Sequence, residues 1–260
     1  MGLSRIHLYL SEKESLGPAE ASVYQALIER RGSHIPLEYV MGKVLFLDEE
    51  FLVDSRVLIP RPETELLVEE AIRRLTKIPE PFVIDIGTGC GNIAAILAKR
   101  LKARTWAIDI SREALAVAES NAKRLGVCDR ITFLEGDLFG PLKGLDLEGR
   151  VDLVISNPPY VKRSDIARLA PEIRLHEPTV ALDGGEDGLT FYRKLIPDSG
   201  LFLKPGSFLF LEVGDGLGKD VKALVEAQNS FFKKPEILED LSGMERILIA
   251  KKANPQQILS

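Results

Sequence analysis

The feature that most constrains the fold is a regular alternation of short apolar strands with amphipathic helices, which begins at Phe82. Most of the strands are separated by helix-like stretches such as residues 112–125. This alternation predicts an α/β fold, in which a parallel sheet is covered by helices on both faces. The strand candidates are residues 82–86, 105–108, 131–134, 151–155 and 207–213.

The end of the chain follows a different pattern. Residues 236–239 and 246–250 are apolar, and the turn between them is too short for a crossover helix. We therefore expect these two strands to pair antiparallel. The result is a seven-stranded, mostly parallel sheet with an antiparallel terminal hairpin. In open sheets of this type, ligands bind beyond the carboxyl ends of the strands.

The first 80 residues predict smaller elements. Gly17-Pro18 opens a helical segment, and Gly32 lies where a C-cap glycine is expected. Residues 43–47 and 51–53 indicate a β-hairpin around residues 48–50, and Pro60-Arg61-Pro62 precedes a helix at 63–75. We predict a small helical domain at 1–42, a linker hairpin at 43–60 and the main domain at 61–260.

Composition narrows the classes of partner. A net charge of -5 and a pI near 5.5 argue against non-specific nucleic-acid binding. Two cysteines without metal-ligand spacing suit a reducing compartment, and the three scattered histidines suggest no metal site. The apolar stretch at 6–10 is too short for a signal peptide, and no uncharged run approaches the roughly 20 residues of a membrane span. We expect a cytoplasmic protein without a membrane segment.

A glycine loop, Gly87-Thr88-Gly89-Cys90-Gly91, connects the first strand of the sheet to a helix at 93–101. Bare glycines and free backbone N–H groups allow a cofactor to approach closely. The dinucleotide fingerprint needs its third glycine one residue later, where this chain has Asn92, and Asp85 would repel a pyrophosphate. A cofactor with a cationic head fits this loop better.

Asp109 ends the second strand, about 20 residues beyond the loop, which is the interval at which an acidic side chain accepts hydrogen bonds from ribose hydroxyls. Loop and acid together indicate S-adenosylmethionine. The alternative is a tight turn, with Asp109 capping the next helix. Cys90 has no histidine base near it in sequence and is interpreted as a passive loop position. Asp137 and the Leu138 backbone, after the third strand, are expected on the adenine side, although an ordinary turn remains open there.

A second motif, Asn157-Pro158-Pro159-Tyr160, follows the fourth strand at the same sheet edge. The two prolines make a rigid turn that presents the Asn157 oxygen and the Pro158 carbonyl as acceptors beside an aromatic wall, Tyr160. An amide attacks a methyl group poorly unless its N–H bonds are held and its developing positive charge meets oxygen acceptors. The turn therefore predicts methylation of a planar NH2 group. The alternative is a strand-ending turn whose asparagine satisfies local backbone.

At these motifs the chain resembles class I methyltransferases that methylate amino groups, and more closely the PrmC/HemK family. That family methylates the glutamine of the Gly-Gly-Gln motif in peptide-chain release factors. The resemblance covers nearly the whole chain, and its discriminating motifs are 58–65 (Leu-Ile-Pro-Arg-Pro-Glu-Thr-Glu) and 177–189. Asn-Pro-Pro-Tyr by itself also occurs in adenine-N6 DNA methyltransferases and in ribosomal-protein glutamine methyltransferases.

The resemblance implies a Rossmann-like class I methyltransferase fold and S-adenosylmethionine as cofactor. It implies that the segment 60–65 forms a lid over the cofactor, for which an ordinary helix start is the alternative. The implied cofactor contacts are Gly87, Thr88, Gly89, Cys90, Gly91, Asp109, Asp137, Leu138 and Asn157. The implied substrate contacts are Asn157, Pro158, Pro159 and Tyr160, with Asn157, Pro158 and Tyr160 catalytic.

Family members carry several more helices before the segment that matches residues 3–6, so we expect a shortened N-terminal domain, which puts release-factor docking in question. The expected function is N5-methylation of a release-factor glutamine. Three rivals remain at this point. The first is an adenine-N6 nucleic-acid methyltransferase that flips its base, and the second is a ribosomal-protein glutamine methyltransferase. The third is a cofactor-binding module without activity.

Overall fold

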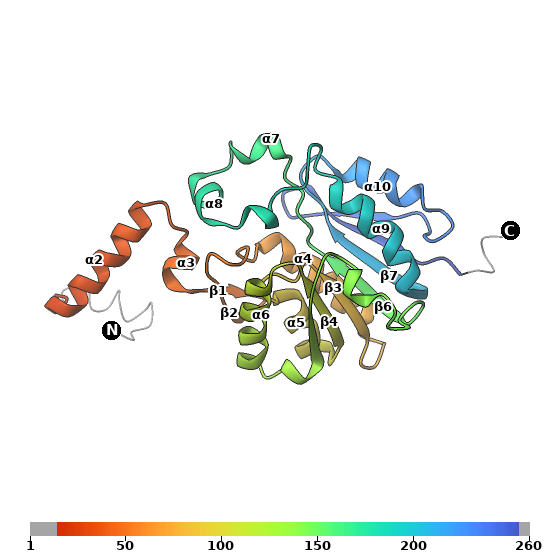
Figure 1. Ribbon diagram of the computed structural model, residues 1–260, viewed down its shortest axis with the longest axis horizontal. Helices are drawn as coiled ribbons and strands as arrows, with labels where there is room; N and C mark the ends of the chain where they lie inside the picture. The colour runs from red at the N-terminus through yellow and green to blue at the C-terminus, as the bar shows by residue number, and fades with distance from the viewer. Residues whose placement is uncertain (1–14, 255–260) are drawn as a thin grey trace.

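The computed structural model of the chain describes residues 15–254, which contain a seven-stranded sheet, a separate hairpin and the helices around them (Figure 1). The strand order is β5-β4-β3-β6-β7-β9-β8. Neighbours from β5 to β7 are parallel, and β9 runs antiparallel to both β7 and β8, as predicted. The strands are β3 (Phe82–Ile86), β4 (Arg104–Asp109), β5 (Ile131–Glu135), β6 (Val151–Ser156), β7 (Leu203–Glu212), β8 (Glu236–Glu239) and β9 (Glu245–Lys251).

Helices cover both faces of the sheet, because successive residues of a strand point to opposite sides. Val83 belongs to the apolar cluster that includes residues of α4 (Pro62–Leu75), α5 (Asn92–Leu101) and α6 (Arg112–Arg124), whereas the next residue, Ile84, belongs to the cluster that includes residues of α9 (Thr190–Phe202) and α10 (Gly218–Glu226). Both side chains are fully buried. Burying a side chain of this size contributes roughly 1.5–3 kcal/mol to stability. Consecutive apolar residues in β3 therefore stabilise the core on both faces of the sheet.

Strand β7 is longer than the apolar run at 207–213 predicts. It begins at Leu203 rather than at residue 207, and its register against β6 shifts between Val151 and Leu153. Gly206 has φ 83, a conformation that glycine adopts without strain. Pro205 and Gly206, which precede the predicted strand, therefore lie inside an irregular one.

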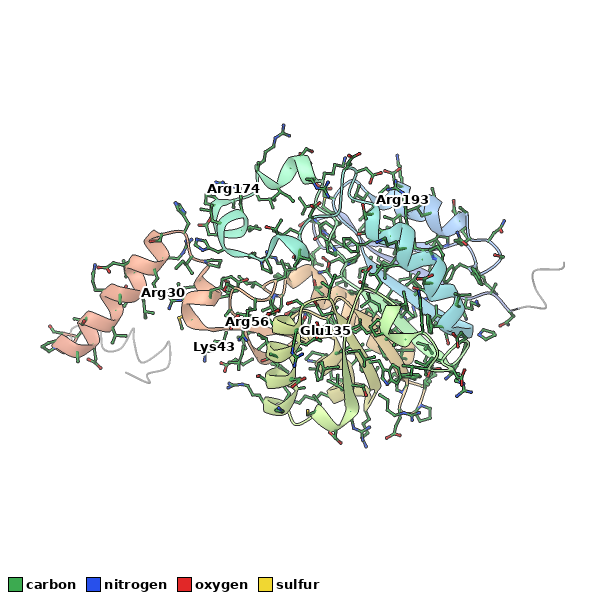
Figure 2. All side chains as sticks on the ribbon, in the orientation of Figure 1. Arg30, Lys43, Arg56, Glu135, Arg174 and Arg193 are labelled. Carbon is green, nitrogen blue, oxygen red and sulfur yellow. The ribbon has the colours of Figure 1, made fainter. Side chains whose placement is uncertain are left out.

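The N-terminal helix α2 (Pro18–Gly32) stands away from the body of the molecule (Figure 1), and none of its residues is buried. It is tethered at its last turn. The Arg30 side chain, labelled in Figure 2, donates through its guanidinium to the carbonyls of Tyr39 (3.2 Å) and Val40 (3.4 Å) on α3 (Leu37–Met41). Arg31 forms an ion pair of 2.9 Å with Glu172 on α8 (Pro171–His176).

Gly32 is not the left-handed cap that the sequence predicts. It remains helical, and Ser33 caps the helix with φ -85, its amide bonding to the carbonyls of Glu29 (3.1 Å) and Arg30 (3.2 Å). The left-handed residue is His34, with φ 63. The helix therefore ends in a tightened last turn and does not need a glycine cap there.

The hairpin is tighter than predicted. Its strands β1 (Lys43–Phe46) and β2 (Glu49–Leu52) are joined only by Leu47 and Asp48, which have φ 47 and 67. The expectation of a turn at 48–50 is wrong, since the acidic residues 49 and 50 are strand residues that pair with cations on α5 and α6. Glu65 of α4 accepts the Leu47 N–H at 2.9 Å and anchors the turn.

Short helices complete the fold: η1 (Cys128–Arg130), η2 (Gly140–Leu142), α7 (Arg163–Ile166) and η3 (Thr179–Ala181). Across residues 15–254, no helix is both long and apolar enough to cross a bilayer. In the same range, no group of three or more His, Cys, Asp or Glu side chains has an arrangement that could hold a metal ion. His7 and the apolar stretch at 6–10 lie outside the described residues.

Candidate active site

The motif residues meet at one edge of the sheet, beyond the carboxyl ends of its parallel strands. The glycine loop follows β3, Asp109 ends β4, Leu138 follows β5, Asn157 follows β6 and Glu212 ends β7. The strand order of the sheet reverses between the parallel neighbours β3 and β6, because β4 and β5 lie on one side of β3 and the later strands on the other. Such a switch point opens a crevice for a ligand.

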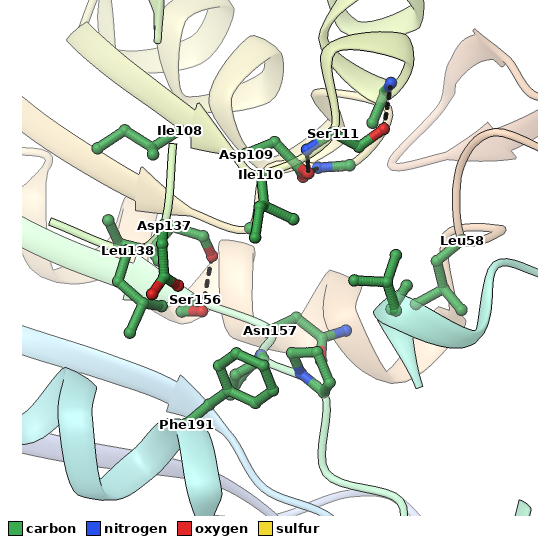
Figure 3. A pocket seen from close by; sticks show the side chains of 18 of the residues that line it. Leu58, Ile108, Asp109, Ile110, Ser111, Asp137, Leu138, Ser156, Asn157 and Phe191 are labelled. Carbon is green, nitrogen blue, oxygen red and sulfur yellow. Dashed lines mark hydrogen bonds between the residues drawn. The ribbon is translucent and has the colours of Figure 1, made fainter. Parts of the chain in front are cut away.

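A cavity of about 300 Å³ occupies this crevice. Figure 3 shows Asp109 and Asn157 on opposite sides of it, with Asp137 and Leu138 toward one end and Leu58 toward the other. Six of the expected cofactor residues therefore share one cavity. They are Gly87, Gly89, Asp109, Asp137, Leu138 and Asn157, and the turn residues Pro158 and Pro159 also line it.

Three other loop residues lie behind the cavity wall. The Thr88 hydroxyl donates to Asp85 at 2.7 Å. Cys90 is buried in an apolar cluster, and burial raises the pKa of its thiol to about 12, so it is a passive loop position in this structure. A Cβ atom on Gly91 would lie 2.9 Å from the Ala118 Cβ, so glycine lets the loop pack against α6. These residues shape the loop and do not line the cavity.

Asp85 also lies behind the loop and is fully buried. Burial raises the pKa of its carboxyl to about 7, although the Thr88 hydroxyl and the Ala94 backbone N–H oppose this rise. Its second oxygen, Oδ1, has no hydrogen-bond partner among residues 15–254. The acid that the sequence places next to the cofactor head is therefore one layer removed from the cavity.

Asp109 joins the glycine loop to β4. Its Oδ2 accepts the Gly89 N–H at 2.8 Å and its Oδ1 accepts the Ser111 N–H at 2.9 Å. Burial raises its pKa, and backbone donors oppose this rise. A carboxylate offers about four acceptor positions, so each oxygen keeps one for a ligand hydroxyl. The cap of α6 is Ser111, which accepts the Ala114 N–H at 3.1 Å, and the alternative role of Asp109 as cap is wrong.

The Asn157 side chain is held by residues that the sequence analysis did not select. Its Nδ2 donates to the Thr64 hydroxyl at 3.1 Å, and Thr64 donates to the Glu212 carboxylate at 2.6 Å. Tyr160 donates to the other oxygen of Glu212 at 3.2 Å. One buried carboxylate therefore holds both ends of the Asn-Pro-Pro-Tyr turn. We call Asn157, Thr64, Glu212 and Tyr160 the turn network.

Thr64 and Glu212 were missed by the sequence analysis because each lies in a segment to which another role was assigned. Thr64 belongs to the motif 58–65, where the acidic neighbours suggested only favourable charges at a helix start. Glu212 is the one charged residue of the predicted strand at 207–213. A carboxylate at the carboxyl end of a central strand is the signal that could have found it, since buried charges need partners.

A second cavity, of about 210 Å³, lies on the other side of the turn. Tyr160 lines this cavity and not the first. Asn157 and Pro158 line both cavities, together with Leu58 and Ala181. A molecule in each cavity would meet at Asn157 and Pro158.

Glycines of the motif 177–189 pack against Tyr160. A Cβ on Gly184 would come within 2.7 Å of the Tyr160 backbone, and one on Gly188 within 2.6 Å of its carbonyl oxygen. Beyond that motif, a Cβ on Gly214 would come within 2.6 Å of the ring. The Val161 carbonyl accepts the Gly184 N–H at 2.8 Å. The glycine spacing of this motif thus fits the close approach of its backbone to the turn.

The two discriminating motifs are tied to each other. Arg61 forms an ion pair of 2.6 Å with Glu177, whose carboxylate is 5% exposed and also accepts the Ile59 N–H at 3.3 Å. A buried charge is tolerated when it is paired and hydrogen-bonded. Leu58 beside this pair lines both cavities. The wall that the two cavities share thus includes Leu58, just before the segment 60–65 that the resemblance identifies as a lid, and of that segment Arg61 lines the second cavity.

The residues present fit S-adenosylmethionine. Asp109 keeps acceptor positions for a ribose, the glycines 87 and 89 expose backbone without steric obstruction, and Leu138 and Phe191 supply apolar walls for a flat base. Mostly apolar pockets with a few placed polar groups are the usual sites for such ligands.

This sheet order and this crevice define a class I methyltransferase that depends on S-adenosylmethionine. The methyltransferase domain model matches residues 83–176, and the PrmC N-terminal domain model matches residues 1–42. A release factor glutamine methyltransferase from Moorella thermoacetica is 41% identical over 249 residues, covering 95% of this chain and 86% of the relative. The chain belongs to the family of release factor glutamine methyltransferases.

Two further comparisons agree. The release factor glutamine methyltransferase from Geobacter sulfurreducens is 40% identical over 249 residues, covering 95% of this chain and 84% of the relative. A methyltransferase structure from Pyrococcus furiosus matches with a TM-score of 0.59 at 18% identity, covering 87% of this chain and all of the other. The structural likeness supports the fold, and the sequence relatives define the family.

Proposed function

We propose that this protein transfers a methyl group from S-adenosylmethionine to the side-chain amide nitrogen of the glutamine in the Gly-Gly-Gln motif of class 1 peptide-chain release factors. The observation that carries the proposal is the position of Asn157 and Pro158 between two cavities. The first cavity suits the cofactor and the second suits the acceptor. Family membership supports the choice of acceptor.

The chemistry required of the turn is to hold an unreactive nitrogen. An amide lone pair is delocalised, so the two N–H bonds must be fixed while the C–N bond forms. In this proposal the Asn157 Oδ1 and the Pro158 carbonyl accept those N–H bonds and stabilise the positive charge that develops on nitrogen. Bound S-adenosylmethionine supplies an electrophilic methyl on its sulfonium. As the C–N bond forms, the C–S bond to the methyl group breaks and S-adenosylhomocysteine is the leaving group. The acidified amide proton then passes to water, so no strong base is needed.

The second cavity fits an unbranched side chain. Its walls combine apolar groups, among them Leu169, Ile173 and Leu182, with the ring of Tyr160. Such walls accept the methylene stem of glutamine and leave its amide for the polar end. Glycines next to the glutamine add no side chain, so the substrate backbone can approach the entrance closely.

The other assignments are proposed on the same footing. Asp109 binds the ribose, Asp137 and the Leu138 backbone border the adenine, and Asn157 contacts the methionine end. We further propose a helical domain at 1–42, a linker at 43–60 and a catalytic domain at 61–260, supported by the domain model over 1–42. The proposed location is the cytoplasm, where release factors act and where the free thiols of Cys90 and Cys128 persist.

Mass spectrometry of a purified release factor tests the proposal. After incubation with the protein and cofactor, the Gly-Gly-Gln peptide should gain one methyl, located on the glutamine by fragmentation. The same factor with its glutamine replaced by alanine should gain none. An unmodified release factor, or methylation of adenine in a DNA duplex supplied in parallel, would overturn the proposal.

A further inference from the structure

The turn network reaches beyond the residues that would touch the acceptor. Glu212 is 1% exposed at the end of β7, and Thr64 is 2% exposed near the start of α4. Neither residue lines either cavity. Through hydrogen bonds of 2.6 and 3.1 Å they connect to the Asn157 amide, which lies between both cavities.

We propose that Thr64 and Glu212 are positioning residues that decide which end of the Asn157 amide faces the methyl acceptor. This inference rests on the proposed function, in which Asn157 Oδ1 accepts an N–H bond of the substrate amide. An asparagine side chain has one acceptor end and one donor end of nearly equal size. Packing alone therefore does not choose between them, whereas a hydrogen-bond partner does.

The direction of the hydrogen bonds makes that choice. An ionised Glu212 carboxylate can only accept, so the single hydrogen of the Thr64 hydroxyl goes to Glu212. The Thr64 oxygen is then left as an acceptor, and Asn157 must turn its NH2 toward it. This orientation leaves Oδ1 for the substrate amide.

Protonation of Glu212 permits the opposite hydrogen-bond directions. Protonated Glu212 can donate to Thr64, and the Thr64 hydrogen becomes available to Asn157 Oδ1, so the amide can turn its NH2 toward the acceptor. Two N–H groups would then face each other. The groups around the Glu212 carboxylate are Thr64 from α4, Tyr160 from the turn, Glu63 from α4, which disfavours ionisation, and Arg246 from β9, which favours it. Burial raises the pKa of Glu212 to about 7, with the bonds from Thr64 and Tyr160 opposing this rise.

A neighbouring residue provides the matched control. Tyr192 is fully buried, and its hydroxyl donates to the backbone carbonyl of Glu212 at 2.8 Å, not to the carboxylate. Tyr192→Phe therefore removes a buried hydroxyl bonded to Glu212 without touching the connection to Asn157.

The test compares Thr64→Val, Thr64→Ser and Tyr192→Phe by steady-state methylation of a release factor and by calorimetric titration of S-adenosylmethionine. We expect Thr64→Val to lower kcat about 10- to 100-fold, less than the roughly 10²- to 10³-fold loss when a charge-stabilising contact is removed outright, with KM for the release factor within about threefold of wild type. Thr64→Ser restores the hydroxyl and should recover most of kcat. Tyr192→Phe should lower Tm and leave kcat unchanged.

The pH profile supplies a readout that a structural role would not move. The kcat of the wild type should rise with pH through about 7, and the profile of Glu212→Gln should be flat there because no group at that position titrates. This comparison of pH profiles tests the inference even if Thr64→Val does not fold. Wild-type kcat in Thr64→Val, or the same pH step in Glu212→Gln, would overturn the inference. Loss of methylation in Asn157→Ala alongside those results would leave the proposed function standing, whereas an inactive wild type would refute the proposed function itself.

Discussion

The Asn157 amide nitrogen donates to the Thr64 hydroxyl across 3.1 Å, so the asparagine uses its donor end inside the protein. An aspartate accepts the same substrate bond but cannot donate to Thr64. We therefore expect Asn157→Asp to lose as much kcat as Asn157→Ala, about 10²- to 10³-fold, the range for loss of one preorganised charge-stabilising bond. Single-turnover methylation of a release factor measures both variants. Aspartate at near wild-type rate would mean that electrostatic attraction alone suffices.

Asp109 should control affinity for the cofactor. On the proposed ribose assignment, Asp109→Ala removes two charge-assisted bonds to ribose hydroxyls, and we expect binding of S-adenosylmethionine to weaken by roughly 2–4 kcal/mol. Isothermal titration gives the dissociation constant. The control is Asp129→Ala, which removes an exposed carboxylate of η1 that lines neither cavity. This variant should bind the cofactor normally. NAD at comparable concentration should displace no cofactor, and an unchanged constant in Asp109→Ala would refute the ribose assignment.

Asp85 should make stability depend on pH. Its pKa in the folded chain is raised to about 7 by burial, so the folded state binds more protons than the unfolded state between about pH 4 and 7. The free energy of unfolding should therefore fall as pH rises through that window, by on the order of a few kcal/mol. Asp85→Asn removes the titrating group. Urea unfolding of the cofactor-free proteins at pH 5 and pH 8 should show a smaller loss in the variant, and parallel losses would contradict the prediction.

Gly91 should be far less tolerant than another glycine of similar conformation. Gly91 and Gly126 have φ 80 and 70, but an added Cβ meets the Ala118 Cβ at 2.9 Å only at position 91. Gly126→Ala should cost about 1 kcal/mol of strain. Gly91→Ala adds an overlap with helix α6 worth a further 1–3 kcal/mol, roughly. Thermal unfolding of both variants measures the difference, and equal costs would mean that the loop can move away from α6.

Much of the sheet follows from local pattern. The run 82–86 is apolar enough to be buried on both faces, and β3 has these bounds. The antiparallel end was predictable because a short turn permits only that pairing. Elements whose conformation depends on residues distant in sequence were not predictable. Residues 49 and 50 are acidic and favour a turn, yet they lie in β2 because Lys99 and Arg124 face them.

The candidate site also has a part that was predictable from the sequence and a part that was not. Gly87, Asp109 and Asn157 follow or end strands, so the topology of parallel strands brings them to one edge and their meeting was predictable. Which side of the loop faces the cavity was not, and Thr88 and Cys90 point away from it. Thr64 and Glu212 gain their role from a contact across 148 positions of sequence, for which no local pattern exists.

The place of β9 has a consequence for biosynthesis. Strand β9, the last one within residues 15–254, pairs with β7, where Ile247 lies opposite Glu212 and the Arg246 carbonyl accepts the Val213 N–H at 2.7 Å. During translation, the glycine loop, Asp109 and the Asn-Pro-Pro-Tyr turn are all synthesised before that strand exists. The edge of β7 stays open until about residue 251 has left the ribosome. A nascent or truncated chain can therefore carry every signature motif before the strand that pairs with the Glu212 end of β7 exists.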